Sequence, residues 1–294
     1  MFHSALIPLL LVLGAFGVLR LSLYLIGIYQ DKKERHAPIA SKNLSGPGQS
    51  TLDLIERVNE ELQGCHTSLI LMPILLFATL LSYSYFGNVS QPWIAMAIAL
   101  GGGLLFLAYY LIKLVRLRSK RAHLRLGYEG EVVVARKLSE MVSKGYQLYH
   151  GFPGDGFYID HILIGPIGVM AIETKTFKSM ARSSREAEPV VTYDGRMLHF
   201  PKYSDYQSID QAKRQAAWLS QWLSCVLGQD ICARAMVAVP GWSVKRTSSD
   251  GIPVVNPKQF ATLFKHITPR PLTRSMIQRI VQQVERQCRK AADS

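Results

Sequence analysis

The stretch FYIDHILIGPIGVMAIETKTF, residues 157–177, decides the fold of the soluble half of the chain. Two strongly apolar runs flank the tetrapeptide GPIG at residues 165–168, which is typical of a turn, so we expect two strands joined as a hairpin. Because successive side chains of a strand point to opposite faces, Glu173 and Lys175 share one face of the second strand with Val169. A carboxylate and an ammonium group therefore end an otherwise apolar strand.

Asp160 adds a second carboxylate to this hairpin. It lies in the first apolar run, and the hairpin brings it near Glu173. Burying charges costs free energy unless they are paired or bind a metal ion. Asp160 and Glu173, with the carbonyl of Thr174, are suitable ligands for Mg²⁺ or Mn²⁺, and Lys175 could orient a bound water or hold a phosphate. The same spacing also fits a solvated ion pair on an edge hairpin.

Helix and strand patterns surround the hairpin. Apolar residues that recur every three or four positions predict helices, and short apolar runs predict further strands. The expected helices cover about residues 127–145, 208–228, 257–267 and 272–290, and the additional strands about 146–152, 233–241 and 252–256. This order of elements predicts an α/β fold, a mixed sheet flanked by helices.

Hydrophobicity is concentrated before residue 116. The three apolar runs cover about residues 6–29, 67–86 and 93–115. Each is long enough to cross a bilayer core of ~30 Å. We therefore expect an all-α membrane region of about three transmembrane helices over residues 1–118, followed by a soluble domain over residues 119–294.

Basic residues flank the apolar runs unevenly. Loop 30–66 contains five Lys and Arg residues and the segment after residue 115 is rich in them, whereas residues 87–92 carry no charge. Because such basic flanks stay in the cytoplasm, we predict an inner (plasma) membrane, multi-pass protein with its N-terminus outside and its soluble domain cytoplasmic. Within the cytoplasmic loop, residues 50–64 predict a helix that lies on the membrane or docks on the soluble domain.

The charge of the soluble half points to a polyanionic partner. Residues 119–294 contain 25 Lys and Arg against 15 Asp and Glu, a net charge of +10 out of +13 for the chain. Nucleic acid and an anionic lipid surface both fit this excess, and a basic membrane flank alone would explain part of it. The four cysteines form no CxxC pair, so neither a disulfide framework nor a structural zinc site is expected.

The stretch from Gly127 to about Pro240 resembles the nuclease-related domain, NERD, of the PD-(D/E)xK nuclease superfamily. Three motifs carry the resemblance in order: GYEGE at 127–131, IDHILIGPIGVMAIETK at 159–175 and DQAKRQAAWL at 210–219. The resemblance implies a restriction-endonuclease-like fold. The active-site residues that it implies are Asp160, Glu173 and Lys175, the helix glutamate Glu131, and Gln211 as a glutamine that faces the same site.

These observations lead to one functional hypothesis and two alternatives. The hypothesis is a membrane-anchored, Mg²⁺- or Mn²⁺-dependent nuclease that hydrolyses phosphodiester bonds of nucleic acid, more readily DNA than RNA, and for which a homodimer is compatible. The first alternative is a non-catalytic module that holds nucleic acid at the membrane, for which salt-sensitive binding would survive loss of Glu173. The second is a scaffold whose basic surface meets anionic lipid.

Overall fold

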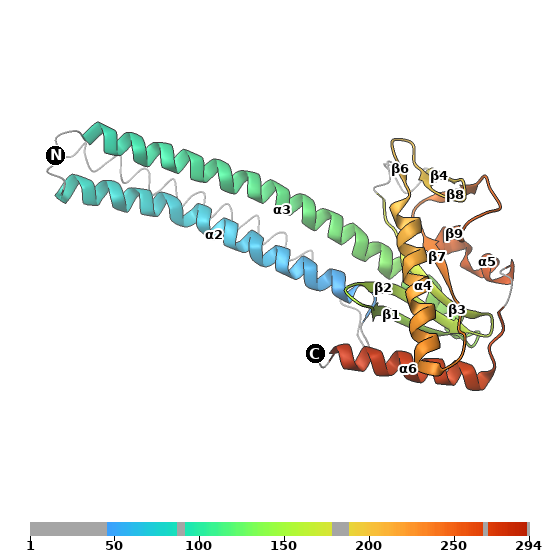
Figure 1. Ribbon diagram of the computed structural model, residues 1–294. Helices are drawn as coiled ribbons and strands as arrows, with labels where there is room; N and C mark the ends of the chain where they lie inside the picture. The colour runs from blue at the N-terminus through green and yellow to red at the C-terminus, as the bar shows by residue number, and fades with distance from the viewer. Residues whose placement is uncertain (1–45, 87–91, 178–187, 267–269, 293–294) are drawn as a thin grey trace. The chain divides into compact units, whose positions relative to one another are not determined.

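The computed structural model describes residues 46–86, 92–177, 188–266 and 270–292 (Figure 1). The described residues divide into two compact units. One lies within residues 55–122, and the other comprises residues 46–54 together with the chain from residue 123 onward. The second unit thus includes a short segment that precedes the first unit in the sequence.

Two long helices make up the first unit and extend into the second. Helix α2 covers Gln49–Phe86 and helix α3 covers Pro92–Val142. Among the described residues, two stretches, Gln49–Thr79 and Ala97–Val142, are long and apolar enough to cross a membrane. This indicates membrane association on length and composition. The first predicted span, residues 6–29, lies outside the described residues.

The apolar parts of α2 and α3 pack against each other in places and expose many large side chains elsewhere. A Cβ on Gly103 would lie 2.9 Å from the Met72 Cε atom, so a small residue permits the approach of the two helices. Arg121 Nη1 donates a hydrogen bond to Asn59 Oδ1 at 3.4 Å. By contrast, Leu105 is 75% exposed. Exposed leucines of this kind are ordinary for helices that contact lipid.

Both helices are longer than the sequence predicted. The helix expected over residues 50–64 does not end at Gly64 but continues through α2, and the helix expected from residue 127 is the last part of α3. The prediction of separate helices was therefore wrong at these two boundaries. A glycine inside a helix costs only ~1 kcal/mol relative to alanine, which the neighbouring turns can absorb.

A five-stranded mixed sheet forms the centre of the second unit, as the sequence predicted. Its strands are β1 (Gln147–Pro153), β2 (Tyr158–Gly165), β3 (Gly168–Thr174), β7 (Ala233–Ala238) and β9 (Val254–Val255), in the order β1-β2-β3-β7-β9. The pairs β1–β2 and β2–β3 are antiparallel, whereas β7 is parallel to both β3 and β9. Strand β3, which carries Glu173, is therefore in the middle of the sheet.

A second, smaller sheet was not predicted from the sequence. It contains β4 (Val190–Tyr193), β5 (Leu198–His199), β6 (Ser204–Asp205) and β8 (Ser243–Arg246), in the order β6-β5-β4-β8. These strands have two to four residues each. Such lengths are too short for an alternating pattern to identify a strand.

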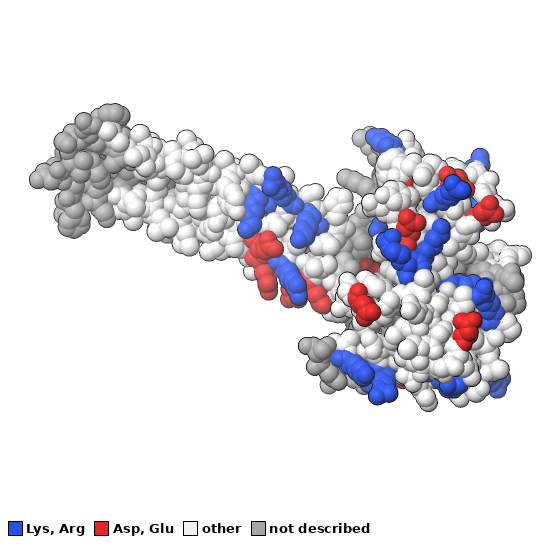
Figure 2. All heavy atoms as spheres, viewed as in Figure 1, with Lys and Arg blue, Asp and Glu red and all other residues white. Residues whose placement is uncertain are grey.

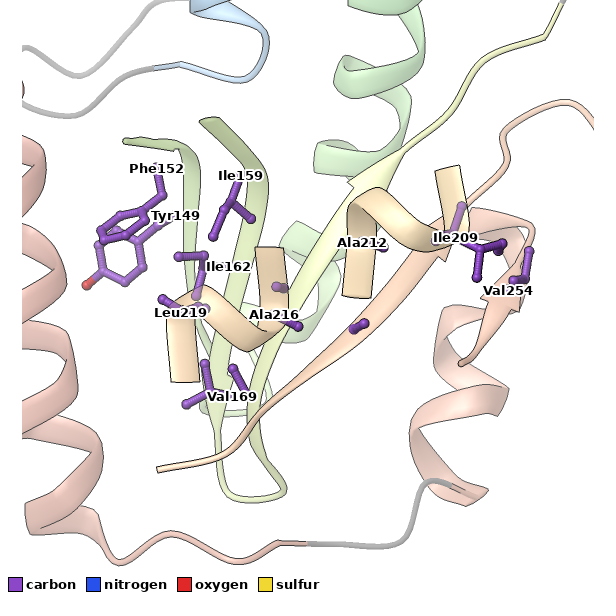
Figure 3. Close-up of a cluster of buried hydrophobic side chains, with 14 of the residues drawn as sticks. Tyr149, Phe152, Ile159, Ile162, Val169, Ile209, Ala212, Ala216, Leu219 and Val254 are labelled. Carbon is purple, nitrogen blue, oxygen red and sulfur yellow. The ribbon is translucent and has the colours of Figure 1, made fainter. Parts of the chain in front are cut away.

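Helices cover both faces of the central sheet. They are α4 (Gln207–Leu227), the 3-10 turn η1 (Pro257–Gln259), α5 (Phe260–His266) and α6 (Arg274–Ala292). On one face, Leu219 and Ala216 of α4 pack against Ile162 and Val169 (Figure 3). On the other face, side chains of α3 and α5 pack against a separate set that includes Met170. The central strands are thus buried between two layers of helices.

Candidate active site

Asp160 and Glu173 lie opposite each other where β2 and β3 leave the buried sheet. The β2–β3 register pairs His161 with Ile172, and continuing that register by one residue places Asp160 across from Glu173. Asp160 Oδ2 accepts a hydrogen bond from the backbone N–H of Thr174 at 2.7 Å. The hairpin therefore brings together the two carboxylates that the sequence singled out.

The alternation along β3 directs its side chains to different cores. Val169 and Ala171 pack in the cluster that contains α4, whereas Met170 and Ile172 pack in the cluster that contains α3. Glu173 follows Ala171 by two residues and so belongs on the α4 side. Every residue of β3 is buried, and Glu173 is only 3% exposed. This burial is incompatible with a solvated ion pair on an edge strand.

Burial raises the pKa of both carboxyl groups and so favours their protonated forms. It raises the pKa of Glu173 to about 7, against the lowering effects of a hydrogen bond from Gln215 and of the Lys175 charge. Burial also raises the pKa of Asp160 well above its usual range, and the neighbouring carboxylates of Glu173 and Glu131 add to this. Perturbed acids of this kind cluster at functional sites because a catalytic or ligand role requires them.

Glu131 reaches the same site from helix α3. Its pKa is raised by burial and lowered by a hydrogen bond from Thr51, whose Oγ1 lies 2.9 Å from Glu131 Oε1. The preceding Gly130 explains how the helix approaches the strand end. A Cβ at Gly130 would lie 1.9 Å from Thr176 Cγ2 and 3.3 Å from Pro240 Cγ, so no larger residue fits. In GYEGE, Gly130 thus permits the close packing of α3, and Glu131 places a carboxylate at the site.

Helix α4 contributes a second glutamine, Gln215, which lies one turn after the predicted Gln211. Gln215 Nε2 donates to the carbonyl of Tyr158 at 3.1 Å, and Gln215 also bonds to Glu173. Gln211, the predicted residue, is partly exposed, and its side chain forms no hydrogen bond within the described part of the chain. Both residues lie on the same side of α4 because they are four positions apart.

Two buried oxygen atoms at this site have no partner. Glu173 Oε2 and Gln215 Oε1 make no hydrogen bond to any described residue. Unsatisfied buried acceptors are rare in folded proteins, and each one costs about 1–3 kcal/mol. The pair therefore marks a place where a donor or a cation would be favourable.

Lys175 follows β3 directly and is partly buried. Its backbone N–H donates to the carbonyl of Ala238 at 2.9 Å, which extends the β3–β7 alignment beyond the last paired residues. Its charge lowers the pKa of both Asp160 and Glu173. Among the described residues, no ion pair within 4.0 Å involves Lys175, so its ammonium group is not taken up by a structural contact.

A histidine pair supports the strand end from the opposite face of the sheet. His161 is fully buried, and its Nε2 lies 3.1 Å from Thr174 Oγ1 while its Nδ1 lies 2.8 Å from His150 Nδ1. Burial lowers the pKa of His150 to about 4 and that of His161 well below its usual range. His161 is thus buried on the face of the sheet opposite Asp160.

No preformed site with three or more His, Cys, Asp or Glu ligands is present among the described residues. Mg²⁺ commonly binds through only one or two carboxylates and retains several waters. The pair Asp160 and Glu173 meets this smaller requirement.

Comparison with known proteins identifies the family of this region. Residues 126–240 match the family model NERD, the nuclease-related domain. No curated protein and no solved structure was found to match the chain. The matched range contains all six predicted site residues, Thr174 included, and Gln215, and it excludes Thr51. Residues 126–240 are therefore a nuclease-related domain, which begins within α3.

Proposed function

We propose, from the premise that residues 126–240 are a nuclease-related domain, that this protein is a membrane-anchored nuclease that hydrolyses phosphodiester bonds with the help of a divalent cation. One observation carries the proposal: Asp160 and Glu173 face each other at the end of the fully buried strand β3, and Lys175 is the first residue after that strand. A fold places unpaired acids in such surroundings only at a cost in stability. A catalytic role accounts for that cost.

The residues present fit a hard divalent cation. Asp160, Glu173 and the carbonyl of Thr174 would hold Mg²⁺ or Mn²⁺, and the partnerless Oε2 atom of Glu173 supports this assignment. A bound cation would supply a more acidic water and stabilise charge on a phosphoryl oxygen.

The remaining side chains have roles that follow from their charge. Lys175 would hold a phosphate oxygen or orient the attacking water. Gln215 stabilises the ionised form of Glu173, since its hydrogen bond lowers the pKa of that carboxyl. Glu131 adds a third carboxylate, whose negative charge raises the pKa of the other two. Gln211 lies one turn before Gln215 and would contact substrate at the opening of the site.

The expected substrate is nucleic acid, DNA more readily than RNA. The +10 net charge of residues 119–294 favours a polyanion. Figure 2 displays Lys and Arg side chains spread over the viewed face of the second unit, with fewer Asp and Glu among them. A homodimer would bring two such sites to the two strands of a duplex.

We further propose that the protein resides in an inner (plasma) membrane as a multi-pass protein. The candidate spans and the basic flank after residue 115 support this. In this topology, the N-terminus is outside, and loop 30–66 and the nuclease-related domain are cytoplasmic.

The test is cleavage of labelled DNA and RNA, single- and double-stranded, by the full chain in detergent, with Mg²⁺, Mn²⁺ or EDTA. Asp160→Asn, Glu173→Gln and Lys175→Ala should each abolish metal-dependent cleavage. Glu131→Gln should reduce it, whereas Glu129→Gln, an exposed glutamate on the same helix, should leave it unchanged. Cleavage that persists in the Asp160 and Glu173 variants would refute the proposal.

Two other outcomes would favour the alternatives. Tight, salt-sensitive binding of nucleic acid without cleavage in any metal would favour a binding module. Binding to anionic vesicles that DNA does not compete away, again without cleavage, would favour a lipid-facing scaffold.

A further inference from the structure

The first turn of α2 contacts the active-site glutamate. Residues 46–54 belong to the same compact unit as the nuclease-related domain, although they lie outside the matched range 126–240. Thr51 Oγ1 donates a partly buried hydrogen bond to Glu131 Oε1 at 2.9 Å. The two residues are 80 positions apart in the sequence. The contact is therefore tertiary, and it ends on a residue of the site.

Gly48 supplies a second contact between the same two turns. Its φ angle is +73°, and a Cβ there would lie 2.6 Å from a ring carbon of Tyr128 and 3.5 Å from Glu131 Oε2. Tyr128 and Glu131 are three positions apart, so they are neighbours on one side of α3. Only glycine combines this backbone angle with such a close approach. The turn that carries Thr51 is thus packed onto the turn of α3 that carries Glu131.

The hydrogen bond acts on the charge state of Glu131 as well as on its orientation. Burial raises the pKa of Glu131, and the bond from Thr51 lowers it. A hydroxyl that donates to a carboxylate favours the ionised form. Thr51 therefore restrains one oxygen of a carboxylate whose charge is felt by both Asp160 and Glu173.

We propose that Thr51 is a positioning residue of the nuclease site, which holds the Glu131 carboxylate in its working orientation. The first turn of α2, which lies outside the range 126–240, is then part of the catalytic unit. This inference rests on the proposed function, because a positioning role has meaning only for a site that acts. Thr51 itself is not required to touch the substrate.

The test uses the full chain in detergent and two substitutions at one position. Thr51→Val removes the hydroxyl and keeps the shape, and it should lower kcat about tenfold with little change in KM, the factor expected when a hydrogen bond to a charged group is lost. Thr51→Ser keeps the hydroxyl and should restore most of the rate. Ser50→Ala, at the neighbouring hydroxyl, is the control and should behave as the unmodified chain.

A double-mutant cycle separates positioning from a general structural effect. In a Glu131→Gln background, Thr51→Val should cause no further loss of kcat, because its effect passes through Glu131. An equal loss in both backgrounds, failure of Thr51→Ser to restore the rate, or an unchanged kcat in Thr51→Val would each overturn the proposal.

Amide hydrogen exchange distinguishes failure of this inference from failure of the proposed function. If the unmodified chain cleaves nothing with any metal, the proposed function fails. Amide exchange of residues 48–54 then tests by itself whether Thr51 holds the Glu131 carboxylate. Faster exchange in both Thr51→Val and Glu131→Gln supports the hold on Glu131. Unchanged exchange in both variants overturns it.

Discussion

Replacing Glu173 by Gln should stabilise the fold at alkaline pH while it abolishes cleavage. The buried carboxyl has a pKa of about 7 in the folded chain, against an ordinary value of 4.5. An acid whose folded-state pKa is raised binds its proton more tightly in the fold. Its contribution to stability is therefore present below pH 4.5 and is lost as the pH rises through about 7. Glutamine has nearly the same shape and no charge to bury.

The size of the effect follows from the difference between the two pKa values. A folded-state pKa of about 7 against 4.5 corresponds to roughly 3 kcal/mol that the ionised carboxylate costs the fold above pH 7. For a unit of this size, that free energy is equivalent to a rise in Tm of roughly 6 to 12 °C. The attraction to Lys175 is already included in that pKa, because the lysine charge lowers it. At pH 4.5 and below, Glu173→Gln should hardly change Tm.

Thermal unfolding followed by tryptophan fluorescence measures this effect, since Trp218, Trp222 and Trp242 all report on the second unit. The scans should be run in EDTA at about pH 5 and about pH 8, on either side of the folded-state pKa, with Glu140→Gln, an exposed helix glutamate, as the control. Added Mg²⁺ should narrow the gap at the higher pH, because the cation binds the folded, ionised chain. A lower Tm for Glu173→Gln at the higher pH would mean that the carboxylate serves a structural ion pair. The same gain at both pH values would mean that the gain does not come from the ionisation of Glu173.

Three further predictions concern other parts of the chain. Because the pKa of His150 is lowered to about 4, the unfolded chain takes up the proton first, and the contribution of His150 to stability should be lost as the pH falls from 6.5 towards 4. His150→Phe should remove this contribution, so the Tm of the variant should hold up better than that of the unmodified chain over this range, and parallel Tm-against-pH curves would contradict the assignment. Gly130→Ala should destabilise the fold by several kcal/mol and slow cleavage, because its Cβ would overlap Thr176. Gly127→Ala, whose Cβ would meet nothing within 4 Å, should instead stabilise α3 by ~0.5–1 kcal/mol. Equal changes in the free energy of unfolding, measured by chemical denaturation, would refute this packing. In intact cells, the exposed Cys225 and Cys232 should react with a membrane-impermeant maleimide only after permeabilisation, and prompt labelling would reverse the proposed topology.

The central fold could be predicted because its signals are local. The glycines at residues 165 and 168 flank the turn, and the apolar runs on either side are long enough to identify two strands, which pair as expected. The extent of α3 could not be predicted in the same way. The change from apolar to basic residues after position 115 is typical of the end of an element, but α3 continues through it. Composition determines whether a stretch of helix faces lipid or water, and it does not interrupt the backbone hydrogen bonds of the helix.

The site was predictable where one strand hairpin determines it and less so where tertiary packing does. Hairpin register alone brings Asp160 to Glu173. The choice between Gln211 and Gln215 depends on how far α4 is shifted along the sheet, and helical periodicity contains no information on that shift. Thr51 was beyond sequence reasoning, because its contact with Glu131 joins two helices across 80 positions of the sequence.

The position of β3 in the sheet decides between the two interpretations that the sequence permitted. An ion pair on an edge hairpin would leave Glu173 in water, where its charge costs little. Strand β3 instead lies between β2 and β7, with helices on both faces, and the Glu173 carboxyl is 3% exposed with one oxygen unpartnered. The carboxyl is therefore either neutral, or ionised with the partial compensation that Gln215 and Lys175 supply among the described residues. Because its pKa is about 7, both forms are populated near neutral pH, and a divalent cation would select the ionised one. The ionised Glu173 carboxylate destabilises the fold in the absence of a partner charge, and a bound cation would remove that cost.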